Sequence, residues 1–286
     1  MDRMARLALA PLAAVLMSAG LLSACGGSEA REEAWPDGLT AYVDQTRLQR
    51  NTGEAFVRLV NDIGTPIEVS RVEVSSDRFR AEWTGSEAVD PEMDFDFDMP
   101  RGRCGEGGDA DLTLTWRRTG DEAGEWRTST GRAKDRYANI DGLLDRDCAE
   151  RTLSEAADVT VGEPRIEGEG RQAEFVLPVT FAPTGALPEV TFDGWEGTVL
   201  FQLASGTPAW PRVAPRPMTG EPITLGMRVV PARCDPHALA DDKVGSLFRV
   251  HVAGPGVPED AAYFLPLSKA QKVALYGLLP VRCGWE

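Results

Sequence analysis

Short runs of alternating hydrophobic and polar residues, separated by turn residues, follow one another along most of the chain. Alternation with a period of two is typical of half-buried β-strands. In the first half the runs predict strands at 55–61, 67–75, 79–84, 93–99 and 111–118. In the second half they predict strands at 173–181, 189–193, 198–203, 223–230, 247–252 and 262–267. The alternation slips at Ser70 and Arg71, which predicts a change of face or a β-bulge there.

Helical signals are few and stand late in each half. Ser268 and Gln271 have the spacing of a capping box, which predicts a short helix from there to about Leu278, ending before Pro280. Its counterpart in the first half is expected at 134–144. Many short strands with frequent turns favour an all-β fold of two tandem immunoglobulin-like β-sandwich domains, each closed by one short C-terminal helix.

Four cysteines follow Cys25, and they divide evenly between the two halves. Four cysteines allow three pairings. The similar spacings favour the two bridges Cys104–Cys148 and Cys234–Cys283, one in each domain. A zinc site is disfavoured because the chain has no C-x-x-C pair.

The flanks of these cysteines indicate a tandem repeat. Gly142-Leu143-Leu144 precedes Cys148 by the same offset as Gly277-Leu278-Leu279 precedes Cys283. Matching strand motifs occur in the same order near the start of each half. We therefore expect a duplicated domain with one disulfide in each copy.

The first residues carry an export signal. Arg3 and Arg6 precede an uncharged apolar run over 7–22, which is shorter than the roughly 20 residues that a membrane-spanning helix needs. The segment ends in Leu22-Ser-Ala-Cys25, which resembles the bacterial lipobox. The resemblance implies that Cys25 receives a diacylglyceryl group and becomes the mature N-terminus, so that two acyl chains anchor the protein.

The expected organisation is a signal peptide (1–24), a lipidated N-terminus and flexible linker (25–38), a first sandwich (39–153) and a second sandwich (154–286). The chain resembles uncharacterised lipoproteins of high-GC Gram-positive bacteria, through its lipobox, the Asn61–Pro66 strand connection and the late cysteine pair. That resemblance implies no known activity. It does imply a location on the outer face of the cell membrane.

Charge narrows the list of partners. The formal net charge is −15, and nucleic acid and anionic lipid repel such a surface. We therefore expect no nucleic-acid partner, and contact with the membrane through the lipid on Cys25 alone.

An acidic stretch is the most unusual local feature. Asp94, Asp96 and Asp98 alternate with Phe95 and Phe97, which predicts a strand with aromatic residues facing inward and carboxylates outward. The stretch lacks the glycine and glutamate that a calcium loop of the EF-hand type requires. A solvated strand face, a contact with the other domain or a partner, and a divalent-cation site remain open.

A single histidine offers a candidate site. If a helical turn begins at Pro236, His237 and Asp241 lie on one face, where a carboxylate–imidazole pair orients a metal ligand or a general base. The alternative is a surface turn capped by Asp235. No metal site is predicted firmly.

The segment 206–217 is rich in proline and carries Trp210, Arg212 and Arg216. Such a segment is suited to docking on an aromatic groove or an acidic surface, or it is a rigid connection between strands. One hypothesis is that its arginines contact the acidic stretch across the domain interface.

Signatures of common enzymes are missing from the sequence, including a Gly-x-Ser-x-Gly elbow and a His-Glu-x-x-His run. We expect a non-enzymatic module without a cofactor, which binds a protein partner or supports an envelope assembly. The alternative is a lipoprotein that binds a ligand or a divalent cation.

Overall fold

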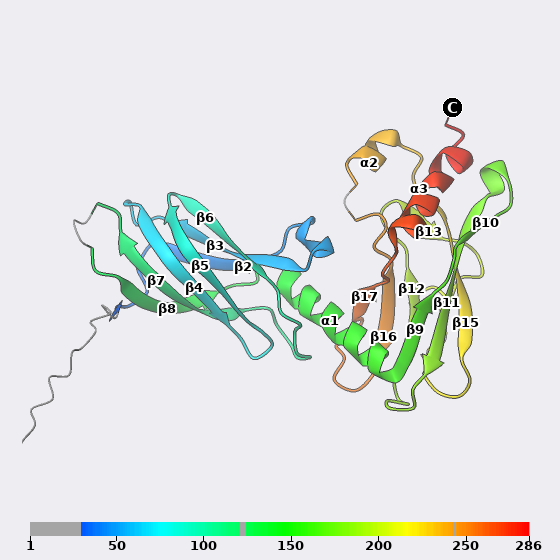
Figure 1. The fold of residues 1–286 in the computed structure, drawn as a ribbon, viewed down its shortest axis with the longest axis horizontal. Helices are drawn as coiled ribbons and strands as arrows, with labels where there is room; N and C mark the ends of the chain where they lie inside the picture. The colour runs from blue at the N-terminus through cyan, green and yellow to red at the C-terminus, as the bar shows by residue number, and fades with distance from the viewer. Residues whose placement is uncertain (1–29, 121–123, 243, 286) are drawn as a thin grey trace, which may run out of the picture.

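Two β-rich units stand at opposite ends of a long helix in the computed structural model, which describes residues 30–120, 124–242 and 244–285 (Figure 1). The described chain is mostly β, with four sheets and two disulfides. The predicted signal peptide (1–24) and Cys25 lie outside the described residues. We call β1 to β8 the first unit and β9 to α3 the second unit; helix α1 lies between them.

Two sheets enclose the core of the first unit. The three-stranded sheet has the order β2-β3-β6 and consists of β2 (Leu39–Asp44), β3 (Glu54–Asn61) and β6 (Glu92–Asp98). The five-stranded sheet has the order β1-β8-β7-β4-β5 and consists of β1 (Arg31–Glu32), β4 (Ile67–Ser75), β5 (Arg80–Val89), β7 (Ala110–Arg118) and β8 (Arg127–Ala133). A short 3₁₀ helix, η1 (Gln49–Asn51), connects β2 to β3. The expected bulge is confirmed by a register shift between Val69 and Arg71.

Two sheets also enclose the core of the second unit. One has the order β10-β11-β15-β13, with β9 also paired to β11, and consists of β9 (Ala157–Val161), β10 (Arg165–Glu167), β11 (Glu174–Pro183), β13 (Phe201–Leu203) and β15 (Ile223–Pro231). The other has the order β14-β12-β16-β17 and consists of β12 (Thr191–Glu196), β14 (Arg216–Pro217), β16 (Arg249–Ala253) and β17 (Ala262–Phe264). The smaller helices are η2 (Gly170–Gln172), α2 (Pro236–Ala240) and α3 (Lys269–Cys283).

The two units share a strand order. In the first, β3 lies between β2 and β6; in the second, β11 lies between β9 and β15. The facing sheets correspond in the same way, with β8-β7-β4 matching β17-β16-β12. The sheets therefore agree with the duplication that the cysteine flanks indicate.

Helix α1 (Asn139–Ala156) is longer and begins later than expected. The prediction of a helix over 134–144 is wrong at both ends. Asp135 cannot lie in the helix because its carboxylate accepts hydrogen bonds from the backbone N–H of Asn139 and Asp141, at 3.0 and 2.8 Å. The helix continues to Ala156 because its second half packs into the second unit.

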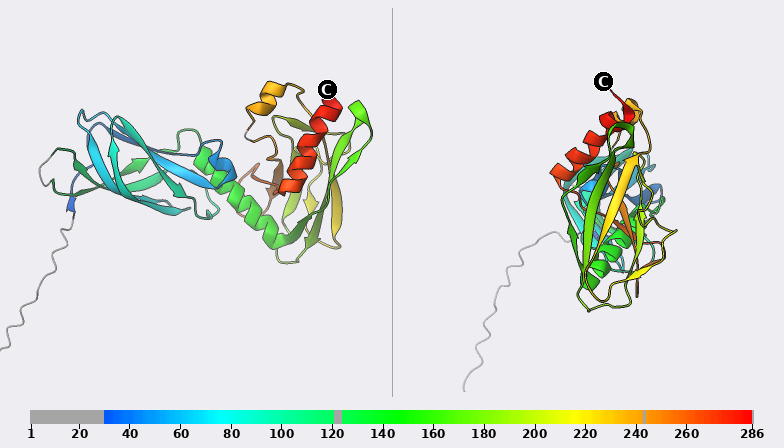
Figure 2. Two further views of the ribbon diagram at one scale, coloured as in Figure 1. Left: turned by 45° about the horizontal axis from the view of Figure 1, so that its top comes forward. Right: turned by 90° about the vertical axis from the view of Figure 1, so that its right-hand side faces the viewer.

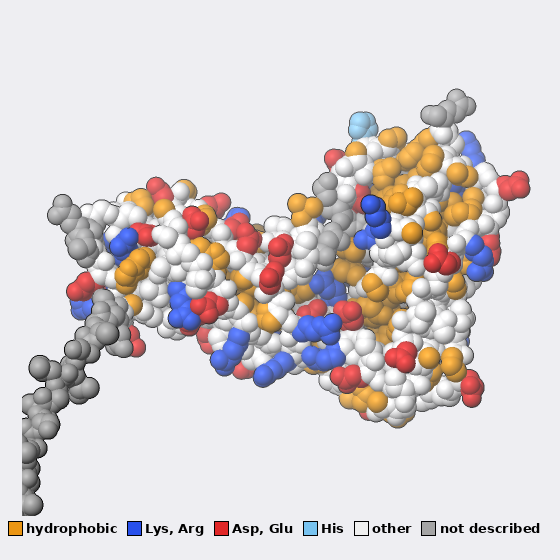
Figure 3. All heavy atoms as spheres, viewed as in Figure 1, with side chains coloured by type: hydrophobic (Ala, Val, Ile, Leu, Met, Phe, Trp, Pro, Cys, Tyr) orange, Lys and Arg blue, Asp and Glu red, His pale blue; other side chains and the backbone are white. Residues whose placement is uncertain are grey.

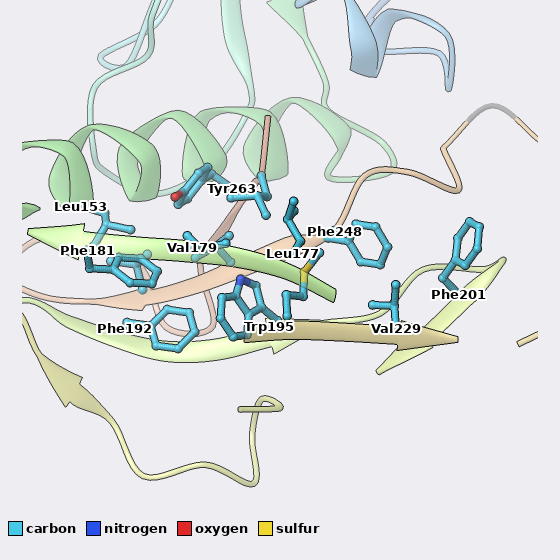
Figure 4. Close-up of a cluster of buried hydrophobic side chains, with 14 of the residues drawn as sticks. Leu153, Leu177, Val179, Phe181, Phe192, Trp195, Phe201, Val229, Phe248 and Tyr263 are labelled. Atoms are coloured by element: carbon cyan, nitrogen blue, oxygen red, sulfur yellow. The ribbon is translucent and has the colours of Figure 1, made fainter. Parts of the chain in front are cut away.

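Side chains of α1 belong to both hydrophobic cores. Ile140 and Leu144 pack in the core of the first unit. Ala149, Leu153 and Ala156 pack in the core of the second, where Leu153 lies near Phe181 in the cluster drawn in Figure 4. The two additional views in Figure 2 show the same helix joining the units. The expected domain boundary between 153 and 154 therefore falls within α1.

Helix α3 begins as expected and ends later. The capping box is confirmed, with Ser268 Oγ accepting from the N–H of Gln271 at 3.2 Å. The predicted end before Pro280 is wrong, since the helix continues to Cys283 and ends at Gly284 with φ of 68°. Burial of Leu278 and Leu279, just before Pro280, and the bridge from Cys283 to Cys234 hold the last turn in place.

Both disulfides have the pairing that the spacing favours. Cys104 is joined to Cys148, and Cys234 to Cys283. The first bridge ties the loop after β6 to the middle of α1. Arg151 strengthens that attachment by donating to the carbonyl oxygen of Gly102 at 2.9 Å.

Candidate interaction surfaces

The segment around His237 forms a capped surface turn. The expected turn is confirmed as α2, and Asp235 caps it by accepting from the N–H of His237 at 2.9 Å. His237 and Asp241 are both exposed, and no bond between their side chains is formed. Within the described ranges, no group of three or more His, Cys, Asp or Glu residues is arranged to hold a metal ion. In the structure, therefore, Asp235 caps the short surface helix α2.

The acidic stretch lies on β6 with its aromatic residues buried and Asp96 and Asp98 exposed. Asp94 forms a two-point ion pair with Arg58 of β3, with both N–O distances 2.7 Å. This hydrogen bond is the main reason that the pKa of Arg58 is raised. Asp96 accepts from Gln49 Nε2 at 2.8 Å. The partners of the acidic row therefore come from the first unit itself.

The proline-rich segment packs on the second unit. Trp210 stacks on His251 of β16 with ring centroids 4.0 Å apart and an interplanar angle of 3°. Gly194, at φ of 120°, permits this close approach, because a Cβ there would lie 2.7 Å from the backbone nitrogen of Trp210. Arg216 is part of β14 and pairs with Phe192. The hypothesis that this segment contacts the acidic stretch is not supported, because each has its partners in its own unit.

Beneath Trp210, a buried imidazole forms an arrangement that the sequence did not indicate. The side chain of His251 is 3% exposed, and its Nε2 lies 3.0 Å from Glu196 Oε2. Its Nδ1 is buried and has no hydrogen-bond partner in the part of the chain that the structure describes. The hydrogen bond from His251 lowers the pKa of Glu196, against the opposing effect of burial. Trp210 covers the His251 ring, so the imidazole holds the proline-rich segment against β16, while the Glu196 carboxylate stays partly exposed.

Sequence reasoning missed this arrangement because His251 and Glu196 are 55 residues apart. The only available signal was the alternation in β16, which places His251 on the opposite face from Val250 and Val252. Those two side chains belong to the core. The alternation shows only that the histidine is on the outer face of the strand. It does not show whether another segment of the chain packs over it.

Replacement of Glu196 by Gln should lower the free energy of unfolding at neutral pH and change it little in acid. The lowered pKa of Glu196 means that its ionised form stabilises the folded state at neutral pH, and this stabilisation is lost as the pH falls through the folded-state pKa. Because Glu196 is 40% exposed, we expect a difference below about 1 kcal/mol at pH 7. Thermal unfolding of both proteins from pH 7 to pH 3 measures it. A constant difference across that range would contradict the assignment.

In the first unit, a polar cleft of about 550 Å³ lies beside the loop that carries Cys104. Its charges are largely paired within the protein: Asp109 accepts from Lys134 at 2.7 Å, and Asp135 caps α1. Arg78, 3% exposed, forms ion pairs with Asp141 and Asp145 at 2.7 Å each. The cleft is therefore a consequence of the way α1 is attached to the first unit.

A second set of depressions lies where the two units meet. One, of about 210 Å³, is lined by Arg50 of η1, Arg146 of α1 and Arg249 of β16. Two neighbouring depressions of about 420 and 430 Å³ also have Arg50 at their edge. In the view of Figure 3, Lys and Arg side chains gather where the units meet. The junction is thus hollow and lined by arginines from both units, together with the carboxylates of Asp145, Glu259 and Asp260.

The comparisons with known proteins name no family. No protein-family model matches the chain, and no curated protein matches its sequence. Among solved structures it is similar to the crystal structure of a protein of unknown function from Porphyromonas gingivalis W83, with 14% identity and a TM-score of 0.21. The similarity covers 79% of this chain and 96% of that one. No helix among the described residues is long and apolar enough to cross a membrane.

Proposed function

We propose that this chain is a lipid-anchored, non-enzymatic module on the outer face of the cell membrane, built from two immunoglobulin-like sandwiches. Its role is to hold the second unit at a fixed distance from the membrane, where it binds a protein partner or supports an envelope assembly. The lipid on Cys25 connects it to the membrane.

Strand order supports the immunoglobulin-like assignment. Counted from β2, the first, second and fifth strands of the first unit form one sheet, and the third, sixth and seventh lie together in the other. The same separation distinguishes the two sheets of the immunoglobulin sandwich. Here the fourth strand, β5, lies at the edge of the second sheet beside β4.

The observation that carries the proposed role is the sharing of α1 between the two cores. A linker that only spans two domains leaves them free to move relative to each other. Here Leu144 and Leu153, on the same helix, are each completely buried in a different core. Bending the chain at the junction would have to expose one of them, so the two units behave as one rigid body.

The position of the chain ends is consistent with a spacer. The described chain begins at the end of the first unit that is farthest from the second (Figure 1). A tether attached there would place the first unit near the membrane and the second unit away from it. The two disulfides favour an oxidising compartment.

Fractionation and crosslinking of intact cells test this function. We expect the wild type in the membrane fraction, and Cys25→Ala released from it because the acylated thiol is lost. Crosslinking followed by mass spectrometry should give a reproducible protein adduct, with attachment sites concentrated in the second unit. Recovery of wild type in the cytosol with free thiols would contradict the location. Attachment sites confined to the first unit would contradict the spacer role.

A further inference from the structure

Three arginines from three separate parts of the chain meet at the junction depression of about 210 Å³. Arg50 comes from the first unit, Arg146 from the connecting helix and Arg249 from the second unit. No one of these elements could bring the three cations together. Their convergence exists only because α1 holds the units in this arrangement.

Two of these cations have no carboxylate partner among the described residues. The guanidinium of Arg146 lies over the Phe264 ring, 4.9 Å from its centroid, and forms no hydrogen bond or ion pair there. Arg50 donates to the neutral amide oxygen of Asn139 at 2.9 Å. Arg249 has an ion pair with Glu196 at 3.5 Å.

Carboxylates are present nearby but are directed elsewhere or lie beyond ion-pair distance. Asp145 is paired with Arg78 at 2.7 Å. Glu259 and Asp260 also line the depression, and among the described residues neither forms an ion pair with its arginines. The depression is therefore lined by as many carboxylates as guanidinium groups, and among the described residues the guanidinium groups of Arg50 and Arg146 are the ones that no carboxylate neutralises by a direct ion pair.

A bound anion would offset the cost of burying the Arg146 guanidinium. Burial is the main reason that the pKa of Arg146 is lowered; Asp147 and Glu150 act against it, and the nearby charges of Arg50 and Arg249 lower the pKa by less. Like charges held together in a partly desolvated site repel each other, whereas an oxyanion placed between them attracts all three. Guanidinium groups suit this role because their planar fork of donors matches the oxygens of phosphate and carboxylate.

We propose that the junction depression is a binding site for an oxyanion, the phosphate or carboxylate group of a small envelope ligand. A volume of about 210 Å³ accommodates such a group but is below the roughly 300 Å³ at which sites for larger ligands begin. The remainder of the ligand extends over Arg50 into the adjoining depressions, which carry Arg47 and Lys272. The bound group contacts both units and the helix, so binding also tightens the junction.

Titration of the full mature protein with inorganic phosphate and with acetate tests the site. Calorimetry and thermal unfolding are measured at constant ionic strength, balanced with sodium chloride. We expect saturable binding of at least one of the two anions with a Kd in the millimolar range, and a rise in Tm. Comparing the tetrahedral anion with the planar one identifies which group the site prefers.

Matched variants localise the binding. Arg146→Gln and Arg50→Gln should each weaken it by roughly tenfold, as expected for the loss of a charge-assisted contact. Arg118→Gln, at an exposed arginine of β7, makes the same change of charge and should leave the Kd unaltered. Circular dichroism establishes that each variant is folded.

Three results would overturn the proposal. The first is that the wild type binds neither anion saturably. The second is that all three variants bind as tightly as the wild type, and the third is that all three bind more weakly by the same factor. Equal weakening would mean that only net charge matters. Crosslinking to a protein partner is independent of these outcomes, so the site and the proposed function can fail separately.

Discussion

Ala149→Pro should lower the unfolding temperature of both units and increase the radius of gyration of the protein. Ala149 is fully buried in the middle of α1. Proline there removes a backbone hydrogen bond and clashes with the preceding turn, at a cost of about 3 kcal/mol or more. The kink would also displace Leu144 or Leu153 from its core, and the loss of a buried leucine from its place adds about 2–5 kcal/mol.

Scanning calorimetry and small-angle X-ray scattering measure these effects together. For units of this size, 3 kcal/mol corresponds to a fall in Tm of roughly 10 °C. Lys269→Pro is the matched control, because it places proline at the first position of α3, where a free N–H is not needed. An unchanged radius together with an unchanged Tm would show that α1 does not couple the units.

Arg78→Met should destabilise the first unit by about 3 kcal/mol, the range found when one partner of a buried ion pair is removed. Arg78 donates to Asp141 and Asp145, and also to the carbonyl oxygens of Arg103 and Gly107 at 3.1 and 3.3 Å. Its loss leaves two neighbouring carboxylates without a cation. It also frees the disulfide loop from the start of α1.

The effect of Arg78→Met should depend on pH. Burial raises the pKa of Asp145 in the wild type, while Arg78 opposes the rise. Without Arg78, the pKa of Asp145 rises further, so the folded variant binds a proton more readily than its unfolded chain. Stability of the variant relative to wild type therefore improves as the pH falls from 7 toward about 4, the pKa of an unfolded aspartate.

Urea unfolding at pH 7 and pH 5 measures this difference. The triple variant Arg78→Met, Asp141→Asn, Asp145→Asn should recover part of the loss at pH 7, because no unpaired charge remains. Arg80→Met, at an exposed arginine two residues away, should change stability by less than about 0.5 kcal/mol. If the loss were the same at both pH values, the ion pairs would not be its cause.

Local signals in the sequence predict much of the sheet architecture. The strongly alternating runs appear as β3, β4, β7 and β11 within one or two residues of the expected limits. The weaker strands β2, β8 and β9 were not predicted. Each is short or rich in polar residues, and each acquires its strand conformation by pairing with a neighbour.

Candidate chemistry was harder to predict than the fold. The alternation in 93–99 correctly oriented the aspartates outward, and Arg58, the cation opposite them, comes from the adjacent strand. For the proline-rich segment, the sequence leaves open a docking segment, a contact with the acidic stretch and a rigid connection between strands, because sequence order does not show that Trp210 reaches His251. The junction arginines carry no motif, since they are separated by about one hundred residues on each side.

Periodicity, capping residues and cysteine spacing can be read from the sequence alone. They predict two similar β-rich halves, the helix start at Ser268 and the pairing of the four cysteines. Tertiary structure decided how far α1 extends and which segment packs over His251. It also decided that one depression is lined by Arg50, Arg146 and Arg249. The physical reason is that burial and electrostatic proximity depend on distances between residues far apart in the chain. The helix ends at Ala156 because the next residues, still buried in the second core, pair with β11 as strand β9. The arginines line one depression because both cores hold that helix.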